Sequence, residues 1–272
     1  VYGSGEFQEL AEGFNSMAEA LEVNQKQLVE AEKMASIGRL AAGVAHEINN
    51  PIAVILGYSK MLLDRLPDQA PERSQLQAVA QEARQCKNIV DGLLDLSRPS
   101  DPTMGEVINP NDVIAEVLNT VRLLQLTEGL RIEDSVIDRP LPLTISRARL
   151  RQLALNIVRN ALEALGGSED GYLKVEGYVR PRSKLEGAAL KEASSDGASF
   201  LVFVFTDNGP GMGPENLERL FEPFFTTKPD GIGLGLAITY NIARAHGGFI
   251  QVQSAPGEGT TFNVGLPLSE EA

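Results

Sequence analysis

An apolar residue recurs at alternating intervals of four and three positions over the first 35 residues. The repeat consists of Leu10, Phe14, Met17, Leu21, Leu28, Ala31 and Ala35, with polar Asn24 in the one remaining position. Such a repeat buries its apolar seam against a partner helix. A surface helix packed on its own domain is the alternative. The Glu- and Gln-rich remainder favours a coiled-coil dimer, in which Asn24 can fix the register.

The helical pattern continues as two long segments as far as residue 98. The first passes through Pro51, where a helix loses a hydrogen bond and bends. Residues 66–74, with two prolines among polar residues, are predicted to be a turn, and the second helix runs from about Leu76 to Leu96. Two such helices cannot bury both faces alone, whereas two hairpins form a four-helix bundle. We therefore predict a dimeric, all-α helical hairpin.

The pattern changes after residues 99–110, which contain several chain breakers and are predicted to be a linker. Helices and strands then alternate. The expected helices are residues 111–126, 147–165 and 236–245, and the expected strands are residues 173–179, 200–206, 249–254 and 260–266. Residues 181–198 are mostly small or polar and are predicted to be a mobile hairpin loop. This order predicts an α/β two-layer sandwich, with helices on one face of a mixed sheet.

Composition restricts the partners and the cellular setting. A net charge of -13 and a pI near 4.7 argue against a nucleic-acid partner, because phosphate backbones need a basic surface. The single cysteine, Cys86, fits a reducing compartment, and its helical face predicts a buried thiol. The chain has no apolar run long enough to span a membrane and does not start with Met, so we expect a fragment of a longer protein.

The two histidines have different surroundings. His46 is followed by Glu47, and a neutral imidazole is a nucleophile that a neighbouring carboxylate can orient or deprotonate. The spacing places His46 just off the apolar seam, so its ring should be exposed. An isolated His-Glu pair is more often an ordinary surface pair, and only its surroundings make it specific. His246 precedes two glycines at a helix end, where a C-cap role is expected.

The residues around His46 supply those surroundings. Residues 35–51, ASIGRLAAGVAHEINNP, resemble the phosphoacceptor box of bacterial sensor histidine kinases. The resemblance implies that His46 accepts the γ-phosphoryl group of ATP and that Glu47 is its acid–base partner. It also implies that Asn50 occupies the position that orients water in members that dephosphorylate their partner.

A second resemblance lies in residues 151–161, which are similar to the N box of the same family. Asn156 and Asn160 are four residues apart and share one helical face. Carboxamide oxygens are hard ligands suited to Mg²⁺. The resemblance implies that Asn160 binds magnesium and that Asn156 lies at the nucleotide. Many family members have lysine three residues after the magnesium ligand, where this chain has Glu163, so no phosphate contact is expected there.

Two further segments resemble the nucleotide boxes. Asp207 follows a predicted strand and can accept the exocyclic amine of adenine, while Gly209 and Gly211 let the backbone approach the nucleotide. By itself this pattern is also ordinary turn chemistry. Residues 221–228, FEPFFTTK, are predicted to be a nucleotide lid, with a small satellite core as the alternative. Lys228 is the basic residue expected to meet phosphate.

The glycine-rich segment 230–236, DGIGLGL, opens the last predicted helix. Backbone amides at a glycine-rich helix start form an anion site. A Rossmann interpretation fails, because a lid rather than a strand precedes the segment. Ile232 replaces the small hydroxyl residue common in the family. Residues 257–262 match the closing Gly-x-Gly-Thr-x-Phe. The expected nucleotide contacts here are Gly231, Gly233, Leu234, Gly235, Leu236 and Thr260.

Taken together, the resemblance covers nearly the whole chain. Residues 1–29 resemble the last helix of a HAMP signalling module, which normally joins a transmembrane helix to the kinase. The resemblance implies a phosphotransfer hairpin over residues 30–98, the linker 99–110 and a GHKL-type ATP-binding domain over residues 111–268. It further implies ATP and Mg²⁺ as cofactors, a homodimer through the hairpin and coiled coil, and a response-regulator receiver domain as partner. The expected location is the cytoplasmic side of a bacterial inner membrane, reached through a segment upstream.

Two other functions fit part of this pattern. An ATPase related to gyrase needs a general-base Glu one turn before Asn160, where this chain has Asn156. A non-catalytic signalling scaffold would not need the intact nucleotide boxes. The sequence therefore predicts an ATP-dependent protein-histidine kinase.

Overall fold

The computed structural model of the chain contains two compact units, Val1–Arg98 and Pro99–Ala272. The described residues are 14, 47–67, 69–97, 106–123, 129–166, 168, 170–185, 189, 190, 193, 199–228 and 231–269. Apart from Phe14, the HAMP-like segment and the coiled coil with Asn24 lie outside the described residues, as does His46.

The first unit contains a helical hairpin. Residues 47–65 are helical through Pro51, and α2 (Glu72–Ser97) follows a short turn. The Arg73 guanidinium donates to the carbonyl oxygens of Leu63 and Leu66, at 2.9 and 3.0 Å. These carbonyls belong to the end of the preceding helix, which has no intrahelical donors left for them. Arg73, in the first turn of α2, therefore links the start of α2 to the end of the first helix.

Small side chains let the two helices of the hairpin approach closely. Among the residues of this unit whose burial is described, the buried ones are Ile52, Ser59, Ala80, Ala83, Val90 and Gly92. Cys86 is exposed, so the prediction of a buried thiol was wrong. Cys86 shares a broad helical face with Ala83 and Val90, but only the small or β-branched neighbours lie at the seam. Many large apolar side chains stay exposed, among them Ile48, Val54, Ile55, Tyr58, Met61, Leu62 and Val79.

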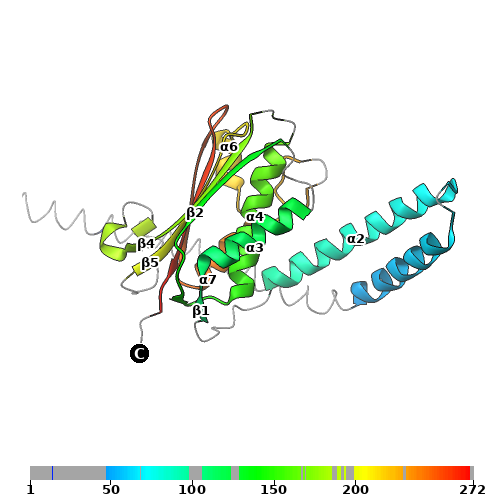
Figure 1. The fold of residues 1–272 in the computed structure, drawn as a ribbon, viewed down its shortest axis with the longest axis horizontal. Coiled ribbons are helices and arrows are strands. Elements are labelled where there is room, and N and C mark those ends of the chain that lie inside the picture. Colours follow the sequence, from blue (N-terminus) through cyan, green and yellow to red (C-terminus); the bar gives the residue numbers. More distant parts are fainter. Residues whose placement is uncertain are drawn as a thin grey trace, which may run out of the picture. The chain divides into compact units, whose positions relative to one another are not determined.

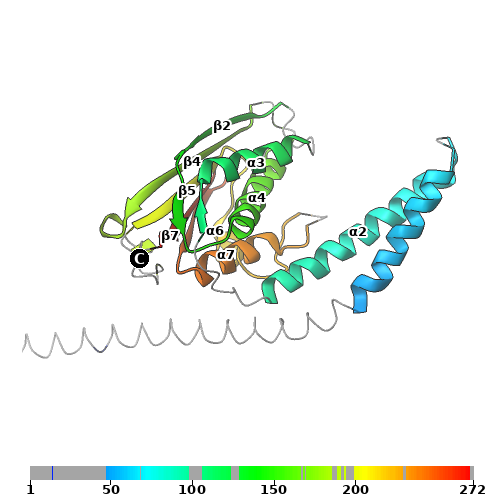
Figure 2. The same cartoon turned by 60° about the horizontal axis from the view of Figure 1, so that its bottom comes forward.

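The second unit is an α/β two-layer sandwich, as predicted. Its sheet has the strand order β2-β4-β5-β7-β6, in which β2 and β4 are parallel and the other neighbours antiparallel. The helices α3, α4 and α7 cover one face of the sheet (Figures 1 and 2). The strands are β2 (Arg131–Val136), β4 (Tyr172–Pro181), β5 (Ser199–Asp207), β6 (Phe249–Ala255) and β7 (Gly259–Pro267).

Side chains at several helix ends pair with backbone groups that have no partner within the helix. α3 (Pro110–Leu123) starts with proline, and the Asn109 side chain accepts from the Asn111 amide at 3.2 Å. α4 (Arg147–Ala164) is capped by Ser146. α7 (Gly235–Ala245) ends at His246, whose Nδ1 lies 2.8 Å from a carbonyl oxygen one turn earlier. The C-cap role expected for His246 is confirmed.

A small second sheet starts inside the expected linker. β1 (Glu106–Ile108) pairs antiparallel with β3 (Leu141–Leu143), and Leu143 also bridges to Leu268 near the end of the chain. The linker predicted over residues 99–110 therefore extends into the fold of the second unit. Pro110, the last proline of that predicted linker, is the first residue of α3.

The main core lies between the sheet and the helices. Leu201, Phe203 and Phe205 of β5 are fully buried and alternate with residues on the other face. Leu150, Leu153 and Ile157 of α4 are also fully buried. Burying a side chain of this size contributes roughly 1.5–3 kcal/mol, so this contact holds α4 rigidly on the sheet.

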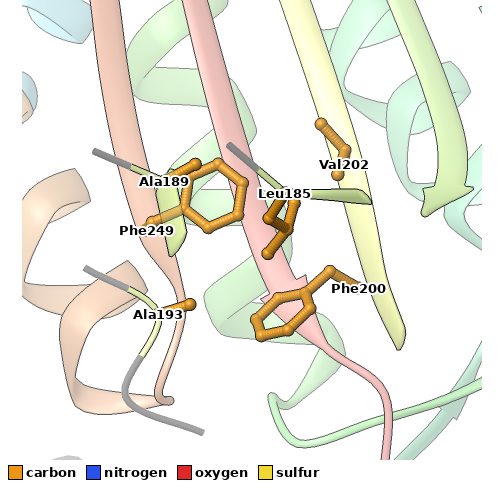
Figure 3. Packing of buried hydrophobic residues seen from close by; sticks show 6 residues of the cluster. All are labelled: Leu185, Ala189, Ala193, Phe200, Val202 and Phe249. Carbon is orange, nitrogen blue, oxygen red and sulfur yellow. The ribbon is translucent and has the colours of Figure 1, made fainter. Parts of the chain in front are cut away.

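The segment between β4 and β5 is more than the mobile loop expected there. After the 3₁₀ helix η1 (Arg182–Lys184), three of its residues are buried against the sheet face opposite the helices. Figure 3 shows this outer cluster in front of the strands; its members are Leu185, Ala189, Ala193, Phe200, Val202 and Phe249. The Phe200 and Phe249 rings are 6.0 Å apart. Two alanines and one leucine in this mostly polar segment are therefore sufficient to pack it against the sheet.

Candidate functional site

Helix α4 presents two asparagines from the same face. The Asn156 amide donates to the carbonyl oxygen of Gly235 at 3.0 Å. Gly235 is the first residue of α7, so this bond fixes the start of that helix against α4. A Cβ at Gly235 would make only an ordinary van der Waals contact, at 3.8 Å, with the Asn156 side chain.

Asn160, one turn further along α4, binds a side chain from the lid. The Lys228 ammonium donates to Asn160 Oδ1 and to Glu163 Oε2, both at 2.7 Å. Arg159 donates to the other carboxylate oxygen of Glu163 at 2.8 Å. Burial raises the pKa of Glu163, but Lys228 and Arg159 together outweigh that effect and the pKa lies below its ordinary value. Glu163 is therefore ionised at neutral pH.

Asp207 is a buried carboxylate at the end of β5. It is only 5% exposed, and it accepts hydrogen bonds from the backbone amides of Gly209, at 2.9 Å, and Thr260. Burial raises its pKa, and the two amides offset part of that rise. Buried carboxyl groups with perturbed pKa values often occur at functional sites. The remaining acceptor capacity of Asp207 suits a ligand N–H group.

The loop after Asp207 needs its glycines. Gly211 has φ +67°, and a Cβ there would collide with the carbonyl oxygen of Ala255. At Gly209 a Cβ would lie 2.9 Å from Asp207 Oδ1, closer than a normal contact, and 3.5 Å from the Cβ of Ala164. The loop that follows Asp207 therefore lies next to α4, the helix that carries the two asparagines.

One serine ties the same loop to the β6–β7 hairpin. Ser254 Oγ accepts from the Met212 amide at 2.9 Å and donates to the Gly259 carbonyl oxygen at 2.7 Å. Thr260 Oγ1 lies 3.0 Å from it. Ser254 therefore links the loop that follows Asp207 to the β6–β7 hairpin. The sequence motifs did not single out this residue, because a serine in a strand carries no signal of its own.

The glycine-rich segment leads directly into α7. Gly233 has φ +72°, its carbonyl oxygen accepts from the Phe224 amide at 2.9 Å, and a Cβ would collide with the lid backbone. Gly231 faces Thr226, where a Cβ would strike the hydroxyl oxygen. Leu234 is buried and precedes the first turn of α7, while Leu236 is half-buried within it. Through these contacts, the lid (residues 221–228) packs against the segment that leads into α7.

The three lid phenylalanines are not one satellite core. Phe221 stacks on Tyr240 of α7, with ring centroids 5.0 Å apart. Phe225 lies under the Arg219 guanidinium at 4.3 Å. Phe224 is 52% exposed and has φ +67°, a conformation that costs an aromatic residue on the order of 1–2 kcal/mol. Arg219 ends α6 (Pro214–Arg219), a helix that the sequence did not predict.

The structure thus gathers the predicted nucleotide residues of the second unit around α4 and α7. Asp207, Gly209, Gly211 and Thr260 form one wall, with an acceptor for an amine. Asn160 and Lys228 lie at the other, beside the amino end of α7, which favours anions. The site therefore has a buried carboxylate acceptor at one end and, at the other, an ammonium group beside the first turn of a helix.

In the first unit, Glu47 and Asn50 are exposed and lie three residues apart on a helix. Residues three apart share one helical face, so both side chains face the same solvent region. His46, the residue that they are expected to serve, lies outside the described residues.

Two family patterns match the chain. "His Kinase A (phospho-acceptor) domain" matches residues 36–102, and "Histidine kinase-, DNA gyrase B-, and HSP90-like ATPase" matches residues 145–270. A phosphoacceptor domain followed by this ATPase domain is the arrangement of one family. The chain belongs to the sensor histidine kinases.

Similar proteins agree with this assignment. The kinase chain is 34% identical over 249 residues to "Sensor histidine kinase ZraS" of Salmonella typhi, covering 90% of this chain and 50% of that protein. It is 34% identical over 254 residues to "C4-dicarboxylate transport sensor protein DctB" of Rhizobium meliloti (strain 1021), covering 91% and 37%. The chain therefore spans about half the length of these relatives, or less.

The fold has a solved counterpart. The crystal structure of full-length ShkA in complex with AMPPNP matches the kinase with a TM-score of 0.67 at 24% identity, over 86% of this chain and 46% of that one. In the part of the chain that the structure describes, no helix is both long and apolar enough to cross a membrane.

Proposed function

We propose that this chain is the catalytic part of an ATP-dependent protein-histidine kinase, in which His46 takes the γ-phosphoryl group of ATP and passes it to an aspartate of a response regulator. The observation that carries the proposal is the arrangement of buried Asp207 and cationic Lys228 around α4 and the start of α7. It offers acceptors and donors where adenine and a triphosphate need them.

The nucleotide is held by groups from several elements. Asp207 accepts the adenine amine, and the backbone around Gly209 and Gly211 lies against the base. The amides of Gly233 and Gly235 at the start of α7 donate to the phosphates. Asn156, Gly231, Leu234, Leu236 and Thr260 complete the proposed contacts.

Asn160 fits a hard cation, because its Oδ1 already accepts from an ammonium group at 2.7 Å. Among the described residues, no three His, Cys, Asp or Glu side chains form a metal-binding cluster. Asn160 would therefore be the protein ligand of Mg²⁺, with phosphate oxygens and water as the others. When bound, the metal neutralises charge that develops on the phosphates.

The imidazole of His46 attacks the γ-phosphorus in line. A nitrogen–phosphorus bond forms as the bond to the ADP oxygen breaks, and Glu47 takes the imidazole proton. Positioning and charge neutralisation supply most of the rate enhancement in such transfers. The phosphoryl group then moves to a receiver aspartate, where an oxygen–phosphorus bond replaces the bond to nitrogen.

Homodimerisation through the hairpin is part of the proposal. Ile48, Ile55 and Leu62 are seven residues apart on one face of the first helix and remain exposed in a single chain. A stripe with this period is typical of helices that pack against partners. The N-terminal coiled coil would extend the same dimer.

A phosphatase activity towards the receiver is supported by Asn50, which is exposed three residues after Glu47. We expect Asn50→Ala to slow loss of phosphate from a phosphorylated receiver while leaving autophosphorylation of His46 intact. An unchanged rate of dephosphorylation would refute the assignment.

The HAMP-like residues 1–29 support a location on the cytoplasmic side of a bacterial inner membrane, with attachment through upstream residues of the parent protein. Fractionation of cells producing the full-length parent tests this: the protein should pellet with inner membranes and resist extraction by salt.

An ATPase remains the competing function, and two measurements separate it from the kinase. Asn156 occupies the position where such an ATPase needs a general-base Glu. The kinase should incorporate about one label per active site from γ-labelled ATP, whereas an ATPase would release phosphate continuously. His46→Ala should abolish incorporation without weakening nucleotide binding.

A further inference from the structure

Lys228 belongs to the lid, yet its ammonium group lies on α4. It contacts Asn160 Oδ1 and Glu163 Oε2 at 2.7 Å each, with a longer contact of 3.5 Å to the Asn160 carbonyl oxygen. Asn160 Oδ1 is also the atom proposed to bind magnesium. The Asn160 side-chain oxygen therefore contacts the Lys228 ammonium group in this structure and is also the proposed ligand of Mg²⁺.

The backbone around Lys228 is held in place by local hydrogen bonds. The Lys228 amide donates to Thr226 Oγ1 at 3.1 Å, and the Gly231 amide donates to the Lys228 carbonyl oxygen at 3.2 Å. Glycine is needed at Gly231, because a Cβ would collide with the Thr226 hydroxyl. The turn therefore aims the lysine at α4.

Glu163 supplies the opposing charge. It is three residues after Asn160 on the same helical face, and Arg159 holds its second oxygen at 2.8 Å. The carboxylate is thus fixed from one side while Lys228 binds it from the other. It stands where many family members carry a lysine.

An ammonium group and Mg²⁺ that both contact the Asn160 oxygen repel each other, so binding of the metal weakens the contact of Lys228 with that oxygen. On the basis of the kinase function proposed above, we propose that Glu163 is a positioning residue. In the nucleotide-free protein, it holds the Lys228 ammonium group against Asn160. Lys228 must therefore leave Asn160 when Mg–ATP binds. Lys228 then moves to the phosphates of the nucleotide. Glu163 determines how strongly Lys228 was held on α4, and therefore how much binding energy its release costs.

Glu163→Gln should therefore tighten binding of Mg–nucleotide. A partly exposed ion pair contributes modestly, so we expect Kd for a non-hydrolysable ATP analogue to fall about two- to fivefold. The gain should disappear in a Lys228→Met background, because no parked ammonium remains to be displaced.

The gain from Glu163→Gln could arise in two ways: from the exchange of Lys228 for Mg²⁺ on Asn160, or from removal of the repulsion between Glu163 and the phosphates. Measurements with and without Mg²⁺ distinguish them. Without metal the analogue is more negative, so pure repulsion predicts a larger gain from Glu163→Gln in EDTA. The exchange predicts a larger gain with Mg²⁺, because only then must Lys228 leave Asn160. Titration of the full chain under both conditions decides between them.

Glu176→Gln is the matched control, since it removes a carboxylate bound to Lys174 at 2.9 Å on β4, outside the site. It should leave Kd unchanged. Weaker binding by Glu163→Gln, an equal or larger gain in EDTA, or a gain that survives Lys228→Met would each overturn the exchange. Failure of the wild-type chain to bind the analogue would instead overturn the proposed function.

Discussion

Asp207 couples function and stability through one buried carboxyl group. Its raised pKa means that it stabilises the fold only at low pH, below the pKa of the unfolded chain, and that this contribution is lost as pH rises through the folded-state pKa. At neutral pH the ionised group costs stability. The fold accepts this cost where an acceptor for a ligand amine is required.

We predict that Asp207→Asn weakens binding of an ATP analogue by about 10- to 100-fold, since a hydrogen bond to a charged acceptor is lost. The free energy of unfolding at neutral pH should stay the same or rise. Calorimetry and urea unfolding measure the two effects, and the chain has no tryptophan to report binding directly. Asp134→Asn on the exposed strand β2 is the control.

The same group predicts a pH dependence. As pH falls through the raised pKa, Asp207 gains a proton and its acceptor capacity drops, so nucleotide affinity should fall at a higher pH than for an ordinary aspartate. The ratio of wild-type to Asp207→Asn affinity isolates this residue, because ionisation of the ligand is common to both. A ratio that stays constant down to the ordinary range of aspartate would contradict the assignment.

Two glycines of the closing box differ only in their surroundings. Gly257 and Gly259 both have φ +82°, but a Cβ at Gly257 meets open space and one at Gly259 collides with the Asp207 carbonyl oxygen. Gly257→Ala should cost about 1 kcal/mol from the backbone alone. Gly259→Ala should cost at least about 2 kcal/mol and also weaken nucleotide binding. Equal losses in urea unfolding would mean that the collision is relieved elsewhere.

At the scale of elements, strong periodicity was predictable and weak periodicity was not. The prediction of helix 147–165 agrees within one residue with α4, and the four expected strands correspond to β4, β5, β6 and β7. β2 was missed, because its sequence RIEDSV is mostly exposed at the sheet edge and lacks apolar alternation. β1, β3 and α6 have three to six residues, too few to show a period.

The outer cluster of Figure 3 gives a prediction at this scale. Leu185 is buried in it, whereas Leu190, in the same segment, is exposed. Leu185→Ala should reduce the free energy of unfolding by about 2 kcal/mol or more, and Leu190→Ala should have little effect. Nucleotide affinity should be unchanged, because Phe200 and Asp207 are roughly 23 Å apart along β5. A loss of affinity in Leu185→Ala would show that the segment supports the site.

The sequence motifs likewise pointed to the residues of the candidate site, but not to the side chains that contact those residues. Their spacing pointed to Asn160, Asp207 and the glycines, because each sits in a pattern tied to its element. The contact of Lys228 with Glu163 joins residues 65 apart and depends on how the lid folds back. No local pattern encodes such a pairing.

At the scale of the whole molecule, the exposed stripe of the hairpin makes assembly testable. Ile55 and Leu62 are each 42% exposed in one chain, and a bundle of two hairpins would bury them. The double variant Ile55→Glu, Leu62→Glu should reduce the solution mass from twice 29.3 kDa to 29.3 kDa. Lys60→Gln, on the exposed side of the same helix, is the control. A variant that stays dimeric would place the interface elsewhere.

Transfer of the γ-phosphoryl group from bound nucleotide to His46 is the central step of the proposed function. The direct measurement is incubation of the full chain with γ-labelled ATP and Mg²⁺, followed by location of the label on the protein. We predict an acid-labile label on His46 that is absent from His46→Gln and, at an ATP concentration near the wild-type Kd, strongly reduced in Asp207→Asn. Label on another side chain, or retained in His46→Gln, would contradict the account.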